Sequence, residues 1–132
     1  MPVPERPVVN KRPVYLNLPR IRLPLPGVMS FLHRFSGALL FLFGIPLLLA
    51  GIGWSLASPD AYAQLKAALA HPLAKLVLIG FVWAYVHHFC AGIRHLLLDV
   101  HIGVDLAAAR RSSAVVAIAS VVLTLIIAVR LW

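Results

Sequence analysis

The stretch FSGALLFLFGIPLLLAGIGWSLA, residues 35–57, is 23 residues long and contains no charged side chain. A helix of about 20 apolar residues spans the hydrocarbon core of a bilayer, so this stretch is long enough to cross a membrane. Two further uncharged runs of 18 residues follow, at 76–93 and 112–129. Each run predicts a helix, because lipid cannot satisfy exposed backbone amides. The fold class that we expect is an all-α membrane protein with three transmembrane helices.

Proline and small polar residues set the limits of the predicted elements. Seven of the ten prolines lie in residues 1–27, and proline breaks helices, so we expect an extended cytoplasmic arm there. Its interleaved apolar residues favour docking on a partner or on the lipid interface, and the alternative is a flexible tail. Between the first two spans, Ser58 or Asp60 can cap a short interfacial helix that ends at Pro72. Pro46 predicts a kink in the first span. The predicted organisation is an arm over 1–27 and an anchor domain over 28–132, with spans at about 28–56, 72–100 and 112–131.

The formal net charge is +8, and most basic residues lie where membrane proteins carry their cytoplasmic charges. They are enriched before the first span and between the second and third, which places the N-terminus and the second loop in the cytoplasm by the positive-inside rule. Attraction to anionic lipid headgroups accounts for this charge, so we expect no nucleic-acid binding. The predicted location is the inner (cytoplasmic) membrane of a bacterium. The basic residues concerned are Arg6, Lys11, Arg12, Arg20, Arg22, Arg34, Arg110 and Arg111.

Three histidines, His87, His88 and His95, lie within nine residues of the second span. From His88 to His95, the stripe at i, i+3, i+4 and i+7 has alanine and glycine at its two middle positions. Small side chains beside a histidine leave room for a haem, which needs an imidazole for its iron and a groove for its macrocycle. No C-x-x-C-H motif is present, so the haem would be of b type. The alternative is that these histidines form hydrogen bonds between helices.

Depth along the helices separates the candidate ligands. At a rise of about 1.5 Å per residue from the cytoplasmic end of the second span, His95 lies about 7 Å deep and His88 about 18 Å deep. In the first span, His33 lies only about 8–9 Å deep. We therefore expect His33 to reach a haem propionate rather than to oppose His88 across one iron, with Arg34 and Arg94 supplying positive charge. A sixth iron ligand would then come from another subunit.

Two further groups of polar residues lie at the cytoplasmic ends of the first and second spans. Ser30 and Arg34 are spaced i, i+4, so a hydroxyl and a guanidinium face the same way and can donate to a carbonyl oxygen of a quinone. The alternative is an arginine that extends to the headgroups beside a capping serine. Asp99 opposes the dipole at the end of its helix and needs a partner, for which His95 is suited. A local ion pair is one interpretation of Asp99, and proton supply is the other.

Three motifs carry a resemblance to a known family, namely RPVYLNL at 12–18, SFLHRFSG at 30–37 and HHFCAGIRHLLLD at 87–99. The chain resembles the cytochrome b subunits of succinate dehydrogenase, which are membrane anchors of respiratory complex II. The resemblance implies that His88 is the axial ligand of haem b and that a second small anchor subunit supplies the opposite histidine. His87 departs from the family pattern, and the register against GIRH favours His88 as the ligand.

The resemblance also implies a ubiquinone site at Ser30 and Arg34, with His33 and Arg34 near the haem propionates. The implied partners are the second anchor subunit, an iron–sulfur subunit, a flavoprotein subunit and the lipid membrane. The chain alone is then expected to have no catalytic activity. Two alternatives stay open at this point, a fumarate reductase membrane anchor and a cofactor-free structural membrane subunit.

Overall fold

The computed structural model describes residue 17 and residues 20–132. The described part of the chain is almost entirely helical and contains no strand. Three helical segments are long and apolar enough to cross a membrane, with mean hydropathies of 2.2, 1.8 and 2.6. The predicted fold class is therefore confirmed. The predicted docking of the proline-rich arm falls almost wholly outside the described residues. The three segments are Leu25–Ala57, Pro72–Asp99 and Leu106–Leu131.

The first span consists of α1 (Leu25–Leu39), a π-helical turn η2 (Leu40–Gly44) and α2 (Ile45–Ala57). Helix α1 begins three residues before the predicted span, directly after Pro24, and has a proline in its first turn. A proline is tolerated there because the first amides of a helix have no partner within the helix. The helical backbone therefore extends into the region that composition alone assigned to the arm.

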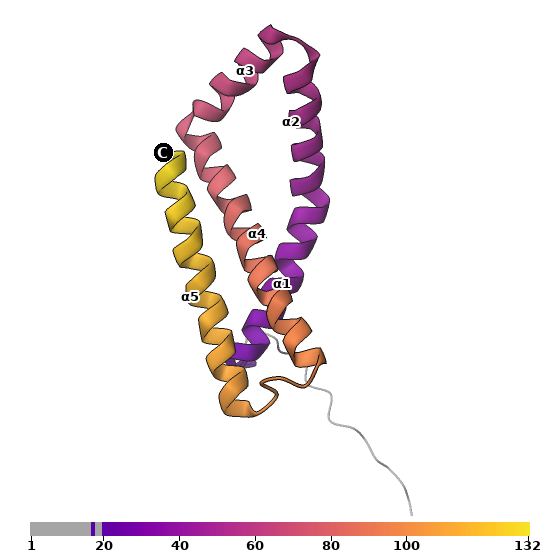
Figure 1. Ribbon diagram of the computed structural model, residues 1–132, viewed down its shortest axis with the longest axis vertical. Helices are drawn as coiled ribbons and strands as arrows, with labels where there is room; N and C mark the ends of the chain where they lie inside the picture. The colour runs from indigo at the N-terminus through magenta and orange to yellow at the C-terminus, as the bar shows by residue number, and fades with distance from the viewer. Residues whose placement is uncertain (1–16, 18–19) are drawn as a thin grey trace, which may run out of the picture.

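The kink predicted at Pro46 takes the form of the π turn that precedes it. Pro46 has no amide hydrogen, and in a regular helix its ring would clash with the carbonyl of Leu42. In η2 the amide of Ile45 donates to the carbonyl of Leu40, five residues back. This wider turn changes the direction of the helix, and α2 continues along a path that leans away from the rest of the bundle (Figure 1).

A short helix, α3 (Pro59–Ala70), joins the first two spans. Ser58 has extended backbone angles, and its hydroxyl accepts a hydrogen bond of 3.0 Å from the amide of Ala61. Ser58 is thus the N-cap, one of the two residues predicted for this role. His71 is extended in the same way, and its ring nitrogen accepts from the amide of Leu73 at the start of α4 (Pro72–Asp99).

The third span, α5 (Leu106–Leu131), begins six residues earlier than predicted. The chain reverses direction between α4 and α5 through His101 and Gly103, which have φ values of 63° and 76°. Arg110 and Arg111, predicted to lie in a loop, are part of the first turns of α5. The predicted start of the third span was the first residue of the uncharged run. A helix can nevertheless continue past the hydrocarbon core, because its charged side chains can extend to the headgroups.

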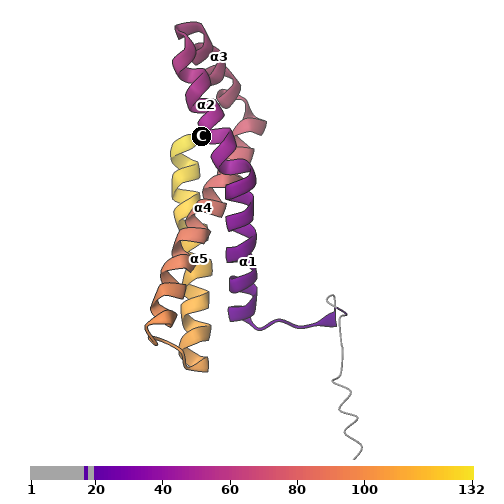
Figure 2. The same ribbon diagram turned by 90° about the vertical axis from the view of Figure 1, so that its right-hand side faces the viewer.

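Helices α1, α4 and α5 pack together at one end of the molecule, and α2 and α3 form the other (Figures 1 and 2). Helices α4 and α5 lie side by side and run in opposite directions, and α1 lies against both. Their shared core contains Met29, Ala91 and Val116, one residue from each helix. Small residues at such positions allow close approach of helices in lipid. This shared core lies at the end of the molecule that carries the polar motifs 30–37 and 87–99.

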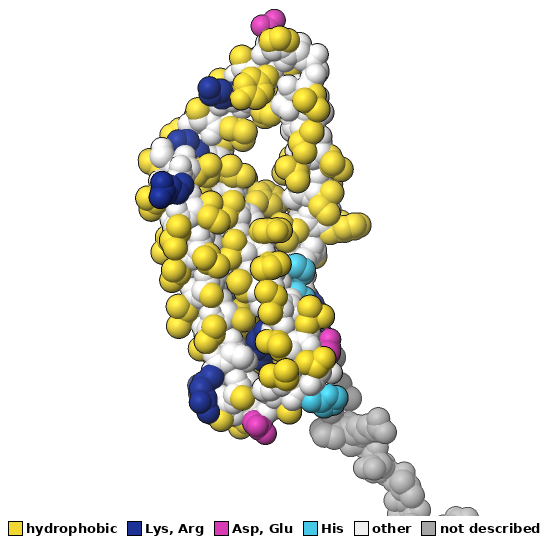
Figure 3. All heavy atoms as spheres, viewed as in Figure 1, with side chains coloured by type: hydrophobic (Ala, Val, Ile, Leu, Met, Phe, Trp, Pro, Cys, Tyr) yellow, Lys and Arg dark blue, Asp and Glu magenta, His cyan; other side chains and the backbone are white. Residues whose placement is uncertain are grey.

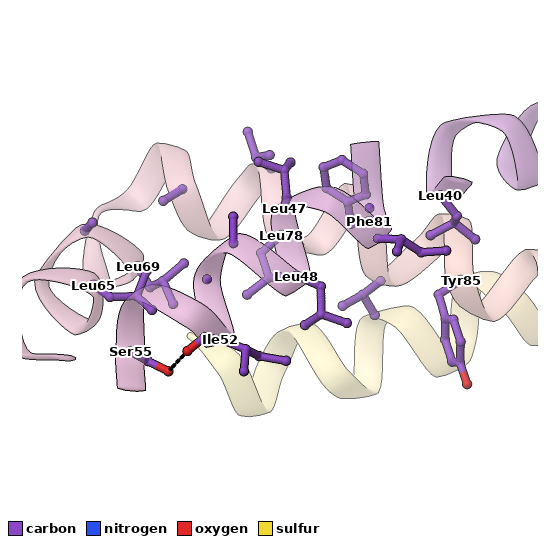
Figure 4. Close-up of a pocket in the computed structure, with 18 of the residues that line it drawn as sticks. Leu40, Leu47, Leu48, Ile52, Ser55, Leu65, Leu69, Leu78, Phe81 and Tyr85 are labelled. Atoms are coloured by element: carbon purple, nitrogen blue, oxygen red, sulfur yellow. Dashed lines mark hydrogen bonds between the residues drawn. The ribbon is translucent and has the colours of Figure 1, made fainter. Parts of the chain in front are cut away.

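A large apolar cavity separates α2 from α4. Its volume is about 1660 Å³, and it is lined by residues of α1 to α4 and by Ile127 of α5. Leu48, Leu65 and Phe81 are among the lining side chains (Figure 4). Helix α3 lies across its outer end, and Gly37 and His88 line its inner end. Apolar side chains also cover most of the outer surface, and Lys and Arg side chains gather toward its ends (Figure 3). This distribution of side chains is that of a protein embedded in a bilayer.

Candidate functional site

Three histidines meet where α1 packs against α4. The rings of His33 and His88 are stacked, with centroids 4.2 Å apart and planes at 11°. The ring of His95 lies 4.9 Å from that of His33 at a tilt of 44°. Gly92 lies between His88 and His95 on α4, and a Cβ there would be 3.7 Å from Nε2 of His33, an ordinary van der Waals distance. His33 thus packs beside the predicted small-residue stripe of α4.

The separation in depth predicted for His33 and His88 is wrong, since their rings are in contact. Helix α1 begins at Leu25, which places His33 eight residues, or about 12 Å, from the helix start. His88 lies eleven residues, or about 16 Å, from the end of α4 at Asp99. The remaining difference of about 4 Å is within the reach of two imidazole side chains. The count from the sequence placed the start of the first span too late.

The hydrogen bonds of His88 determine its tautomer. Its Nδ1 atom lies 3.0 Å from the backbone carbonyl oxygen of His33 and 3.3 Å from the hydroxyl of Ser36. A carbonyl oxygen can only accept, so Nδ1 carries the hydrogen and donates it. Ser36 is fully buried and donates its own hydroxyl to the same carbonyl at 2.9 Å. The Nε2 atom of His88 is left with a free lone pair, which is the state in which histidine ligates a metal.

Gly37 permits the close approach of His88 to α1. A Cβ atom at position 37 would lie 2.8 Å from Cε1 and 3.2 Å from Nδ1 of the imidazole. Sequence reasoning missed Ser36 and Gly37 as site residues. The signal was present, because these small residues follow His33 at i+3 and i+4, as Ala91 and Gly92 follow His88.

Ser30 and Arg34 lie on one face of α1, as their spacing predicts. The guanidinium of Arg34 donates from Nη2 to the hydroxyl of Ser30 at 3.4 Å and from Nε to its carbonyl at 3.3 Å. Arg34 is exposed and Ser30 is half-buried. Both bonds are long, so the donors can turn to another acceptor without losing a strong contact.

Arg94 and Asp99 lie apart from the histidine cluster. The guanidinium of Arg94 donates to the hydroxyl of Ser112 at 3.0 Å and to the carbonyl of Ala109 at 3.4 Å, both on α5. Its predicted contact with a haem propionate stays a prediction, which these bonds do not favour. Asp99 is exposed at the end of α4, and within residues 20–132 it forms no ion pair with His95 or Arg94. Its predicted role in proton supply stays a prediction.

His87 points away from the cluster. It is 1% exposed and stacks on Trp83, with ring centroids 5.3 Å apart. Among the residues that the structure describes, its Nε2 atom has no hydrogen-bond partner. Of the two adjacent histidines, His88 stacks on and hydrogen-bonds to His33 of α1, and its role as the haem ligand stays a prediction.

The part of the chain covered by the structure contains no group of three His, Cys, Asp or Glu side chains that could hold a metal ion by itself. A b-type haem needs less from one chain, namely one axial imidazole and space for the macrocycle. His88 supplies the first, and the cavity whose inner end it lines supplies apolar space beside it. The residues present therefore fit one half of a haem site.

Comparison with known proteins identifies the family of the chain. The family described as succinate dehydrogenase/fumarate reductase transmembrane subunit matches residues 9–127. The succinate dehydrogenase cytochrome b556 subunit of Paracoccus denitrificans is 32% identical over 117 residues, which cover 89% of each chain. The subunit of the same name in Rickettsia typhi is 30% identical, over 91% of this chain and 93% of that one. In Coxiella burnetii it is 32% identical, over 92% and 98%. The predicted family is thus confirmed, and the chain belongs to the transmembrane subunits of succinate dehydrogenase/fumarate reductase, the cytochrome b membrane anchors of complex II.

Proposed function

We propose that this chain holds haem b through His88 in a succinate dehydrogenase and forms part of the site where ubiquinone is reduced. The observation that carries the haem proposal is the hydrogen bond from Nδ1 of His88 to the carbonyl of His33, because it leaves Nε2 free for iron. The relatives are named cytochrome b556 subunits of succinate dehydrogenase, which favours this enzyme over a fumarate reductase.

Each residue of the cluster has a defined task in this proposal. The His33 carbonyl and the Ser36 hydroxyl fix the plane of the His88 ring, and Gly37 gives that ring its space beside α1. The rings of His33 and His95 and the guanidinium of Arg34 supply hydrogen-bond donors for the propionates. When bound, the haem supplies a centre that accepts and returns single electrons. A second small anchor subunit supplies the opposite ligand.

Ser30 and Arg34 form the quinone-binding part of the proposal. Their donors lie in the second and third turns of α1, and a carbonyl oxygen of ubiquinone can approach from the lipid and replace the long bonds between them. A guanidinium binds a carbonyl oxygen more strongly as negative charge develops on it, so Arg34 favours reduction of the bound quinone. Asp99, exposed at the end of α4, is the proposed source of protons.

The remaining parts of the proposal concern assembly and location. The electrons come from succinate through a flavoprotein subunit and an iron–sulfur subunit, both docked at the cytoplasmic face. The arm over residues 1–27 is proposed to contribute to that docking as a unit separate from the anchor domain over 28–132. The excess of Arg and Lys before α1 and at the start of α5 supports a cytoplasmic N-terminus in the inner membrane.

The haem proposal is tested on the purified assembly by a dithionite-reduced minus oxidised spectrum and by haem content per protein. Wild type should show a sharp low-spin b-type signal that is lost in His88→Ala. The matched control is His87→Ala, which removes the adjacent imidazole and should keep the signal. Co-purification of the other subunits with each variant shows that the assembly forms.

Two outcomes contradict the proposal. A signal that survives in His88→Ala assigns the iron to another residue. A wild-type assembly without haem excludes the cytochrome function and favours the cofactor-free structural subunit instead.

A further inference from the structure

A second, smaller groove lies between α4 and α5, and the site proposed above does not use it. Its volume is about 360 Å³, and four residues from each helix line it at the spacing i, i+3, i+4 and i+7. Because the helices are antiparallel, one apolar stripe of each helix faces the other along about 10 Å. The lining residues are Cys90, Ile93, Arg94 and Leu97 of α4 and Ser112, Val115, Val116 and Ala119 of α5.

The groove and the histidine cluster are on different faces of α4. Arg94 follows His88 by six residues, which places it about 120° around the helix from that side chain. His88 contacts α1, and Arg94 contacts α5. A ligand in the groove is therefore separated from the haem and quinone sites by the body of α4.

Arg94 is a buried cation whose hydrogen-bond partners, among the residues that the structure describes, are neutral. It is 6% exposed, and its two hydrogen bonds go to a hydroxyl and a backbone carbonyl. These bonds use two of the five N–H donors of a guanidinium. A buried charge is costly unless an opposite charge compensates it, so an anion at this end of the groove would be stabilised.

A further arginine stands at the same end of the groove. Arg111 directly precedes the lining residue Ser112, so it stands at this end of the groove, rotated by about 100° from Ser112 around α5. Arg110 is rotated by about 100° more and so lies nearly opposite the groove. Basic side chains gather over this end of α5 in Figure 3. Two exposed carboxylates, Asp99 and Asp105, are also at this end, and within residues 20–132 neither forms an ion pair with Arg94 or Arg111.

We propose that this groove binds an anionic phospholipid. One acyl chain lies along the apolar stripes toward Cys90 and Ala119, and the phosphate lies at the end formed by Arg94, Ser112 and Arg111. The occupant is a membrane lipid because the groove is apolar along its length and charged only at the end nearest the headgroups. Basic pockets between transmembrane helices are sites where anionic headgroups bind.

The test measures lipid retention on the purified assembly by native mass spectrometry after exposure to phosphatidylglycerol or phosphatidylcholine. Wild type should retain phosphatidylglycerol in preference to phosphatidylcholine. Arg111→Gln should lower retention of phosphatidylglycerol by about fivefold, the factor expected for one basic residue at the headgroup, and leave phosphatidylcholine unchanged. Arg110→Gln is the matched control, since it removes the same charge one position away, and should retain both lipids as wild type does.

Ala119→Leu tests the groove itself without changing any charge. It fills the deep end and should lower retention of phosphatidylglycerol while the haem spectrum and subunit composition stay as in wild type. Equal losses in Arg110→Gln and Arg111→Gln would overturn the proposal, because general surface charge would then explain binding. Loss of a partner subunit in Ala119→Leu with unchanged lipid retention would also overturn it and assign the groove to a protein interface.

Discussion

Replacement of Gly37 by alanine tests the contact on which the position of His88 depends. The added methyl carbon would lie 2.8 Å from Cε1 of the imidazole, and ordinary van der Waals contact begins at 3.4 Å. The ring must therefore move by at least the difference, 0.6 Å. A displacement of that size along the 3.0 Å bond from Nδ1 to the His33 carbonyl lengthens it to about 3.6 Å, which is no longer a hydrogen bond.

The energetic effect follows from three terms. Overpacking of a tight contact costs about 1–3 kcal/mol. The lost hydrogen bond costs about 1 kcal/mol more. Alanine in place of glycine within a helix stabilises the folded protein by about 0.5–1 kcal/mol, which offsets part of this cost. We therefore expect Gly37→Ala to destabilise the protein by about 1–3 kcal/mol and to weaken or shift the haem signal.

Thermal unfolding of the purified assembly, followed together with its reduced minus oxidised spectrum, measures both effects. The same span offers matched controls in Gly51→Ala and Gly53→Ala, where an added Cβ meets no described atom within 4 Å. These controls should be as stable as wild type or slightly more stable, with an unchanged spectrum. If Gly37→Ala behaves as the controls do, the contact between Gly37 and His88 does not hold the ring, and the reasoning is refuted.

Two further predictions concern the first span. Arg34→Gln should raise the KM for ubiquinone by about tenfold or more, since a charged hydrogen bond contributes about 1.5–3 kcal/mol. Succinate oxidation with a soluble dye should stay normal. An unchanged KM would argue against the quinone site. Pro46→Ala restores an amide donor and should convert η2 toward a regular helix, which moves α2. Spin labels at the exposed positions Leu56 and Leu73 would report this as a changed distance, and an identical distance would show that the proline does not cause the π turn.

The fold was predictable because length and hydropathy determine what can cross a bilayer. The second span, predicted over about 72–100, agrees with Pro72–Asp99 to one residue, since Pro72 and Asp99 are both strong end signals. The ends at Leu25 and Leu106 were not predictable from uncharged runs, because a helical backbone tolerates prolines in its first turn and arginines beyond the hydrocarbon core.

The candidate site was predictable in its residue types and less so in its contacts. The spacing of Ser30 and Arg34 is a property of one helix, and the predicted pair is present. The contact of His33 with His88 depends on how α1 and α4 pack, and counting along straight helices cannot supply that packing. Gly37 is a residue on which the close approach depends. The same limit applies to Arg94, whose sequence neighbour His95 faces α1 while Arg94 itself faces α5.

The π turn at 40–44 acts as a one-residue insertion inside a membrane span. Every residue of α2 is thereby rotated by about 100° from the position that an uninterrupted α-helix would give it. A chain in lipid cannot extrude an extra residue as a loop, because its backbone groups would lack partners. A widened turn keeps those groups paired, so the extra residue is absorbed inside the span and sets which side of α2 lines the large cavity.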